Sequence, residues 1–210
     1  SSAASDVYKR QVIGSTGSGK STLVNLIPRF YDVTEGRVLV DGVDVRDMTQ
    51  KDVRDRLGYV PQKGVLFSGT IDSNIRYGKT DISVEEVKEA AEVAQATEFI
   101  DTKPEKYESP VSQGGTNVSG GQKQRLSIAR AIAKDPEIFI FDDSFSALDF
   151  KTDSQLRKAL KEYTKDATTV IVAQRISTIL GADQIIVLDD GHMAGIGTHK
   201  ELMANCEVYQ

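Results

Sequence analysis

A glycine-rich segment near the start of the chain has the spacing of a phosphate-binding loop. Residues 14–21 read GSTGSGKS, which fits the pattern G-x-x-x-x-G-K-[ST]. Glycines let consecutive backbone N–H groups curl around phosphate oxygens. Lys20 is expected to reach the β- and γ-phosphates of a nucleoside triphosphate, and the Ser21 hydroxyl to bind Mg²⁺. The predicted nucleotide-binding residues are Gly14, Ser15, Thr16, Gly17, Ser18, Gly19, Lys20, Ser21 and Thr22.

Two adjacent carboxylates follow an apolar segment later in the chain. The segment EIFIFDD ends in Asp142 and Asp143, and its continuous apolar run is typical of a buried parallel strand. Phosphoryl transfer needs Mg²⁺ to bridge the β- and γ-phosphate oxygens, and an acid at a strand end can hold that ion through water. Asp142 is the predicted metal ligand. In a chain without a phosphate loop, both acids would be read equally well as polar residues that close a strand.

Strand and helix patterns alternate along the chain and would place these groups. Apolar strands are expected at residues 12–13, 57–62, 137–143, 168–174 and 184–189, and a hairpin at 37–45. Helices are expected at 22–31, 83–100, 124–135 and 154–163, with caps at Ser83 and Thr198. We therefore predict an α/β fold of the P-loop type, with a mostly parallel core sheet flanked by helices, an antiparallel β piece and a helical subdomain at about residues 70–135.

The composition excludes several classes of protein. With 210 residues, 39% hydrophobic and 27% charged, the chain suits one sizeable α/β domain rather than a disordered segment. The net charge of −5 argues against a general nucleic-acid binder, so no nucleic-acid partner is expected. No apolar run approaches the roughly 18 residues of a membrane span.

The first eleven residues, SSAASDVYKRQ, show no strand or helix period. They resemble the in-frame translation of a transposase-based sequencing adapter, and a natural polar N-terminus is the alternative. We therefore expect residues 1–11 to be non-native and residues 12–210 to form a single nucleotide-binding domain that lacks its first strands. The strand that leads into the phosphate loop would then begin at Val12.

Further motifs reveal a family resemblance that covers essentially all of residues 12–210. The segment VSGGQKQR resembles the signature motif of ATP-binding cassette (ABC) transporters, Gln62 in YVPQ resembles their Q-loop, and SALD resembles their D-loop. The order and spacing are those of the family, and VLFSGTIDSNI at 65–75 resembles the exporter branch. The matched signature residues are Val118, Ser119, Gly120, Gly121 and Gln122, and the matched D-loop residues are Ser146, Ala147, Leu148 and Asp149.

The resemblance implies a mechanism shared between two such domains. They would sandwich two ATP molecules, each held by the phosphate loop of one domain and the signature motif of the other. Closure on ATP and opening after hydrolysis would drive a transmembrane domain of the same parent chain, at the cytoplasmic face of the plasma (inner) membrane. The implied cofactors are ATP and Mg²⁺, and the implied metal ligands are Ser21, Gln62 and Asp142.

Two departures from the family pattern affect the expected catalytic residues, which are Asp143, Gln174 and Gln62. The family usually has Glu where this chain has Asp143, whose carboxylate is withdrawn by one C–C bond, roughly 1.5 Å. A misplacement of about 1 Å can cost on the order of 10²-fold in rate. The family's switch histidine is replaced by Gln174, which can hydrogen-bond a γ-phosphate but cannot carry a positive charge.

Together these departures resemble the degenerate site of heterodimeric exporters. The chain's own site would bind ATP and turn it over slowly, while its signature motif would complete a competent site on an unlike subunit. The alternative is a homodimeric exporter in which Asp143 is the base. A soluble chromosome or repair ATPase of the ABC type is disfavoured because no sustained heptads separate the phosphate loop from the signature motif. A regulatory module without turnover is disfavoured by the intact VSGGQ.

Overall fold

The computed structural model describes residues 9–174 and 181–210. These residues form two compact units, each built from separate stretches of the chain. The first unit contains the residues up to Tyr59, Glu137–Asp143 and the residues from Ala167 onward. The second contains Val60–Pro136 and Ser144–Asp166. The boundary of the predicted helical subdomain, at about residues 70–135, stays a prediction.

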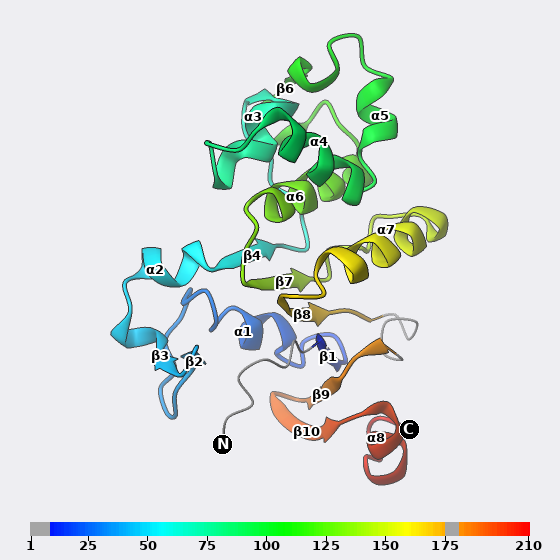
Figure 1. The fold of residues 1–210 in the computed structure, drawn as a ribbon. Helices are drawn as coiled ribbons and strands as arrows, with labels where there is room; N and C mark the ends of the chain where they lie inside the picture. Colours follow the sequence, from blue (N-terminus) through cyan, green and yellow to red (C-terminus); the bar gives the residue numbers. More distant parts are fainter. Residues whose placement is uncertain (1–8, 175–180) are drawn as a thin grey trace. The chain divides into compact units, whose positions relative to one another are not determined.

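The first unit is built on a six-stranded sheet with the strand order β10-β9-β1-β8-β7-β4 (Figure 1). β1 pairs in parallel with β8 and β9, β7 pairs in parallel with β8, and β10 runs antiparallel to β9. Parallel strands buried on both faces read as continuous apolar runs, which explains the IFIF and IIVL segments. The strands are β1 (Lys9–Gly14), β4 (Leu57–Val60), β7 (Ile138–Asp142), β8 (Thr168–Val172), β9 (Gln184–Asp189) and β10 (His192–Gly197).

Strand β1 begins three residues before the expected start at Val12. Lys9, Arg10 and Gln11 pair with β8 in register, and Arg10 and Gln11 also pair with β9. Backbone pairing needs no particular side chain, so a sequence without an apolar period can still extend a strand between two neighbours. The expectation that residues 9–11 carry no strand was wrong, and residues 1–8 lie outside the described part of the chain.

The helices of the first unit are short. They are α1 (Lys20–Val24), the 3-10 turn η1 (Val45–Asp47), α2 (Gln50–Asp55) and α8 (His199–Asn205). The predicted helix at 22–31 ends early, at Val24 with Asn25 as its C-cap. Ile27, which precedes Pro28, is biased away from the helical conformation, so the helix does not resume. The Thr198–Glu201 capping box of α8 is confirmed. Helices α1 and α2 and the turn η1 contribute to a core that includes Val12, Val24 and Ile140, whereas Leu202 of α8 packs in a second cluster with Ile185 and Val187 of β9.

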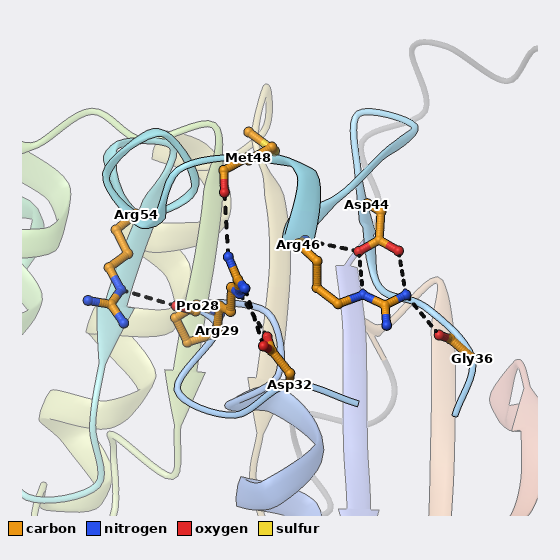
Figure 2. A network of polar contacts seen from close by, with 8 residues as sticks. All are labelled: Pro28, Arg29, Asp32, Gly36, Asp44, Arg46, Met48 and Arg54. Carbon is orange, nitrogen blue, oxygen red and sulfur yellow. Dashed lines mark hydrogen bonds and ion pairs between the residues drawn. The ribbon is translucent and has the colours of Figure 1, made fainter. Parts of the chain in front are cut away.

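The predicted hairpin forms as β2 (Leu39–Val40) and β3 (Val43–Asp44), with Asp41 and Gly42 both at positive φ in the turn. Ion pairs and hydrogen bonds of arginines hold the segment around it (Figure 2). Their partners are two carboxylates and three backbone carbonyls, and the residues drawn are Pro28, Arg29, Asp32, Gly36, Asp44, Arg46, Met48 and Arg54. This network holds together the long connection between α1 and β4, whose regular elements are all short.

The second unit is mainly helical (Figure 1). Its long helix α6 contacts both α4 and α3, and α4 also contacts α7. Ile128 and Leu156, on α6 and α7, are fully buried. The elements are β5 (Gly69–Thr70), α3 (Ile71–Ile75), η2 (Arg76–Gly78), α4 (Val84–Val93), α5 (Thr97–Asp101), η3 (Lys106–Glu108), β6 (Pro110–Val111), η4 (Gln113–Gly115), α6 (Gly120–Ala133) and α7 (Phe150–Tyr163).

The predicted helix at 83–100 is two helices. The Ser83–Glu86 capping box starts α4 as expected, but the helix ends at Val93 with Ala94 as its C-cap, and Gln95 adopts φ 59°. The N–H of Ala96 donates to the carbonyl of Ala91 and that of Gln95 to Glu92, which is the Schellman ending of a helix. Glycine usually occupies this left-handed position, so the glutamine hides the break in the sequence.

Candidate functional site

The phosphate loop follows β1 in the first unit, and its first glycine is sterically required. A Cβ on Gly14 would lie 2.4 Å from the carbonyl oxygen of Leu188 on β9 and 2.4 Å from Ser18 Oγ. Gly17 and Gly19 have φ of 78° and 96°, in the left-handed region that glycine adopts without strain. The turn between β9 and β10 also holds the loop, because Gly191 N–H donates to the Ser18 carbonyl at 3.1 Å.

Lys20 lies inside this loop. Its ammonium group donates to the carbonyl oxygens of Gly14 and Ser15, each at 2.8 Å, and the residue is buried. An ammonium has three N–H donors. Two of them hold the ends of the loop together, and a third can reach an anion. The buried position also keeps the charge close to the loop, which favours a phosphate there.

Ser18 provides an independent sign that the loop is built for a polar ligand. The residue is 1% exposed, and its hydroxyl oxygen has no hydrogen-bond partner among the described residues. Buried polar atoms are nearly always hydrogen-bonded. A phosphate oxygen in the loop would accept a bond from this hydroxyl, so the loop fits a polyphosphate.

Ser21 and Asp142 come together although they are far apart in the sequence. Ser21 Oγ donates to Asp142 Oδ1 at 3.0 Å, because Ser21 lies in the first turn of α1, directly after the phosphate loop, and Asp142 ends the nearby strand β7. A hydroxyl and a carboxylate oxygen at this separation match the oxygen ligands that Mg²⁺ takes beside substrate phosphates. No cluster of three or more His, Cys, Asp or Glu side chains suited to a metal ion occurs among residues 9–174 and 181–210. The pair therefore fits a Mg²⁺ that is shared with a nucleotide.

Tyr59 was missed by the sequence reasoning. Its hydroxyl donates to Asn25 Oδ1 at 2.9 Å and lies 3.5 Å from Asp142 Oδ2. Burial and the Asp142 charge raise the pKa of Tyr59 to about 12, so it stays a neutral donor. Tyr59 lies on β4, three residues before Gln62, and the sequence does not indicate that its side chain would face Asp142.

Asp143 has an unusual backbone conformation directly after β7. Its φ is 49°, and its N–H donates to the carbonyl of Val172 on β8 at 2.8 Å. Asp is among the few non-glycine residues that adopt this left-handed region readily. The turn directs the chain out of the sheet immediately after the predicted metal ligand. The half-buried Asp143 is thus held in place by the hydrogen bond between its backbone N–H and the Val172 carbonyl.

Gln174 follows β8 by two residues and is exposed. Val172 of β8 is paired with Val12 of β1 on one side and with Asp142 of β7 on the other. The carboxyl ends of these parallel strands meet at one edge of the sheet, so the phosphate loop, Asp142, Asp143 and Gln174 emerge there together. Ligands of open α/β sheets bind at this edge.

The signature segment begins α6 in the second unit. Ser119 is the N-cap, and it forms a capping box with Gln122. Ser119 Oγ accepts from Gln122 N–H at 3.1 Å, and the Gln122 side chain accepts from Ser119 N–H at 3.2 Å. The first turn of this 14-residue helix presents backbone N–H groups of Gly120 and Gly121, which suits an anion. Val118, half-buried, precedes the cap.

The D-loop lies against the signature glycines. A Cβ on Gly121 would lie 3.3 Å from the Ala147 carbonyl oxygen, and one on Gly120 would lie 3.8 Å from Ala147 Cβ. Leu148 is buried, whereas Ser146 is exposed. The Asp149 side chain caps α7 by accepting from Thr152 N–H, and this bond lowers the pKa of the carboxyl. The segment is therefore fixed at its end by a helix cap.

The structure brings the predicted residues together in two groups, one in each unit. The first unit gathers the phosphate loop, Asp142, Asp143 and Gln174. The second gathers Gln62, the signature residues and the D-loop, linked by the side chain of Gln124. Gln124 was quoted within the signature segment, but its role as a link was missed because a buried amide in a helix has no sequence pattern.

The parallel sheet with a phosphate loop at its carboxyl edge defines a nucleotide-binding α/β ATPase of the P-loop class. Residues 7–146 match the family model described as ABC transporter. The chain therefore belongs to the ABC transporter family, and the predicted fold class and ATPase class are confirmed.

Relatives of known sequence and structure agree with this assignment. The chain is 50% identical over 201 residues to an uncharacterised ABC transporter ATP-binding protein of Mycobacterium tuberculosis (strain ATCC 25618 / H37Rv), covering 94% of this chain and 34% of the relative. It is 50% identical over 192 residues to YgaD of Bacillus subtilis (strain 168), covering 91% of this chain and 33% of that protein, whose name describes it provisionally as a multidrug export ATP-binding/permease protein.

A solved structure of a bacterial Atm1-family ABC exporter with ATP bound superposes with a TM-score of 0.91 at 40% identity, covering 96% of this chain and 35% of that one. The chain spans about a third of the length of the relatives it matches. No helix among the described residues is long and apolar enough to cross a bilayer.

Proposed function

We propose that the chain is the ATP-binding domain of an ABC exporter, working at the cytoplasmic face of the plasma membrane with a transmembrane domain of the same parent chain. The exporter names of similar proteins support this assignment. Lys20 and Ser18 contact the phosphates, Ser21 and Asp142 hold Mg²⁺ together with Gln62, and the signature residues bind the γ-phosphate of a nucleotide held by a second ABC domain. Mg²⁺ supplies charge neutralisation at the β- and γ-phosphates.

We further propose that this domain's own site is slow and that the second domain belongs to an unlike subunit. The observation that carries the proposal is that Asp143 and Gln174 follow the ends of two neighbouring strands, β7 and β8, whose last paired residues are Asp142 and Val172. One carboxylate is short by a methylene, and the amide that takes the place of the switch histidine cannot become positive. Either change alone leaves a route to hydrolysis, and together they remove both the usual base and the usual cation.

The test is the steady-state ATP turnover of the assembled exporter carrying Asp143→Asn, which keeps the size of the side chain and removes its charge. A slow own site predicts turnover within twofold of wild type, because the chemistry takes place at the partner's phosphate loop. A fall of about 10²-fold or more makes Asp143 a working base and supports a homodimer instead. Asp142→Asn is the matched control, and its nucleotide affinity in Mg²⁺ is expected to fall.

A further inference from the structure

The buried amide of Gln124 joins two functional segments of the second unit. Gln124 lies on α6 and is 4% exposed. Its Nε2 donates to the carbonyl oxygen of Gln62 at 3.0 Å, and its Oε1 accepts from the N–H of Ala147 at 3.1 Å. Nε2 also lies 3.4 Å from Ser146 Oγ. One side chain thus bonds the backbone of the Q-loop and the backbone of the D-loop.

Only an amide of this length satisfies both ends of the link. A backbone carbonyl can only accept and a backbone N–H can only donate, so the partners fix which end of the amide is oxygen and which is nitrogen. A carboxylate in the same place has no donor for the Gln62 carbonyl, and a thioether has neither strong donor nor strong acceptor. Because the amide is buried, a partner left unpaired would carry the full cost of its desolvation.

Two further contacts hold the Q-loop on either side of this bond. Ser144 Oγ donates to the carbonyl of Val60 at 2.7 Å, and Ser144 is fully buried. At Gly64 the loop meets α6 so closely that a Cβ would lie 2.8 Å from the Lys123 carbonyl oxygen. The backbone at 60–64 is therefore positioned by α6 and by the segment that begins at Ser144. Gln124, on α6, is the side chain that hydrogen-bonds both the Q-loop and that segment.

We propose that Gln124 is a positioning residue that sets the Q-loop and the D-loop in one fixed relation. This inference rests on the proposed function, in which Gln62 and residues 146–149 act at ATP sites. Gln124 acts through the Gln62 carbonyl and the Ala147 N–H. Its loss therefore leaves the phosphate loop, and with it ATP binding, intact while turnover falls.

The experiment compares full-length exporter carrying Gln124→Glu or Gln124→Met with wild type. The matched control is Gln155→Glu, the same change at an exposed site on α7. For both Gln124 variants we expect kcat to fall by about tenfold or more, with the ATP KM and the equilibrium affinity for a fluorescent ATP analogue within threefold of wild type. The control keeps the wild-type kcat.

A second variant covers the case in which the Gln124 variants fold poorly. Gly64→Ala leaves Gln124 in place but pushes the Q-loop away from α6. It is measured in the exporter whose partner phosphate loop is disabled, where the remaining turnover belongs to this domain's own site, and it is expected to lower that turnover at unchanged analogue affinity. Wild-type kcat in the folded Gln124 variants overturns the inference, as does a parallel loss of analogue affinity or unchanged own-site turnover in Gly64→Ala. If the wild-type exporter hydrolyses no ATP at all, the proposed function itself fails.

Discussion

Ser21 Oγ and Asp142 Oδ1 lie 3.0 Å apart although 121 residues separate them in the sequence. One belongs to the helix that follows the phosphate loop, and the other ends a strand whose neighbour β8 also pairs with the strand leading into the loop. The sheet order therefore brings these two oxygens together, and the hydrogen bond holds them at a spacing that a small divalent cation can bridge, as the proposed Mg²⁺ site requires.

Removing the Ser21 hydroxyl should weaken Mg²⁺-dependent nucleotide binding specifically. Ser21→Ala is expected to reduce ATP affinity in Mg²⁺ by about tenfold, about 1.4 kcal/mol, because one oxygen ligand is lost. Affinity in EDTA should change little, since the loop and Lys20 remain. Equilibrium binding of a fluorescent ATP analogue with and without Mg²⁺ measures this. Ser154→Ala, on the exposed face of α7, is the control, and an equal loss in EDTA would contradict the assignment.

A methyl group on Gly14 should disrupt the loop. Gly14→Ala places a Cβ 2.4 Å from the Leu188 carbonyl oxygen, which belongs to rigid backbone. Such overpacking costs about 1–3 kcal/mol, so we expect a lower melting temperature together with lost nucleotide affinity. Gly181→Ala, where none of the described residues has an atom within 4 Å of the added Cβ, is the matched control. Normal nucleotide binding by Gly14→Ala would show that the loop can move aside.

Restoring the family's residues should activate the site that we propose to be slow. In the exporter with the partner's phosphate loop disabled, Asp143→Glu with Gln174→His is expected to raise ATP turnover by on the order of tenfold, because the carboxylate regains its reach and a cation-forming group returns. Each single change should give less than the pair. Phosphate release under saturating ATP measures the rate. If wild type already turns over at the rate of the double variant, the site is not slow.

The signature serine should have two separable roles. Ser119 Oγ accepts from Gln122 N–H, so its capping function uses the oxygen as an acceptor, whereas phosphate binding would use the hydroxyl as a donor. Ser119→Asp keeps the cap, which Ser119→Ala loses at about 1 kcal/mol. We expect Ser119→Asp to keep its melting temperature and to lose turnover, because it repels phosphate. Thermal melting and ATP turnover test this, and wild-type turnover in Ser119→Asp would rule out phosphate contact.

Tyr59 should make stability depend on pH in the alkaline range. Its folded pKa is raised to about 12, mainly by burial, from an ordinary value near 10. Both states are protonated below pH 10, and between 10 and 12 the folded state holds the proton longer, so stability falls as pH rises through this window. Tyr59→Phe should show a smaller drop in melting temperature between pH 9 and pH 11. The exposed Tyr31→Phe serves as control, and equal drops in both variants would contradict this.

The sheet could be predicted because its parallel strands are buried on both faces. Such strands appear in the sequence as continuous apolar runs that alternate with helical patterns. The ends of the helices were harder to predict from the sequence. Gln95 ends α4 in a left-handed conformation that usually takes glycine, and Lys9 to Gln11 join β1 through backbone pairing that leaves no trace in side-chain pattern. The positions of the motifs could also be read from the sequence. Tyr59 and Gln124 could not be predicted, because Tyr59 contacts Asp142, 83 residues away, and Gln124 contacts Gln62, 62 residues away. Hydrophobic periodicity carries no information about such contacts.

The chain passes between its two units at four places: after Tyr59, Pro136, Asp143 and Asp166. No continuous stretch of the gene therefore encodes either unit, and a truncation that removes one also interrupts the other. One of these passages is the peptide bond between Asp143 and Ser144, where the carboxylate belongs to one unit and the buried hydroxyl to the other. The units cannot be exchanged between proteins as modules by a single recombination, so variation in either is expected to accumulate by point substitution.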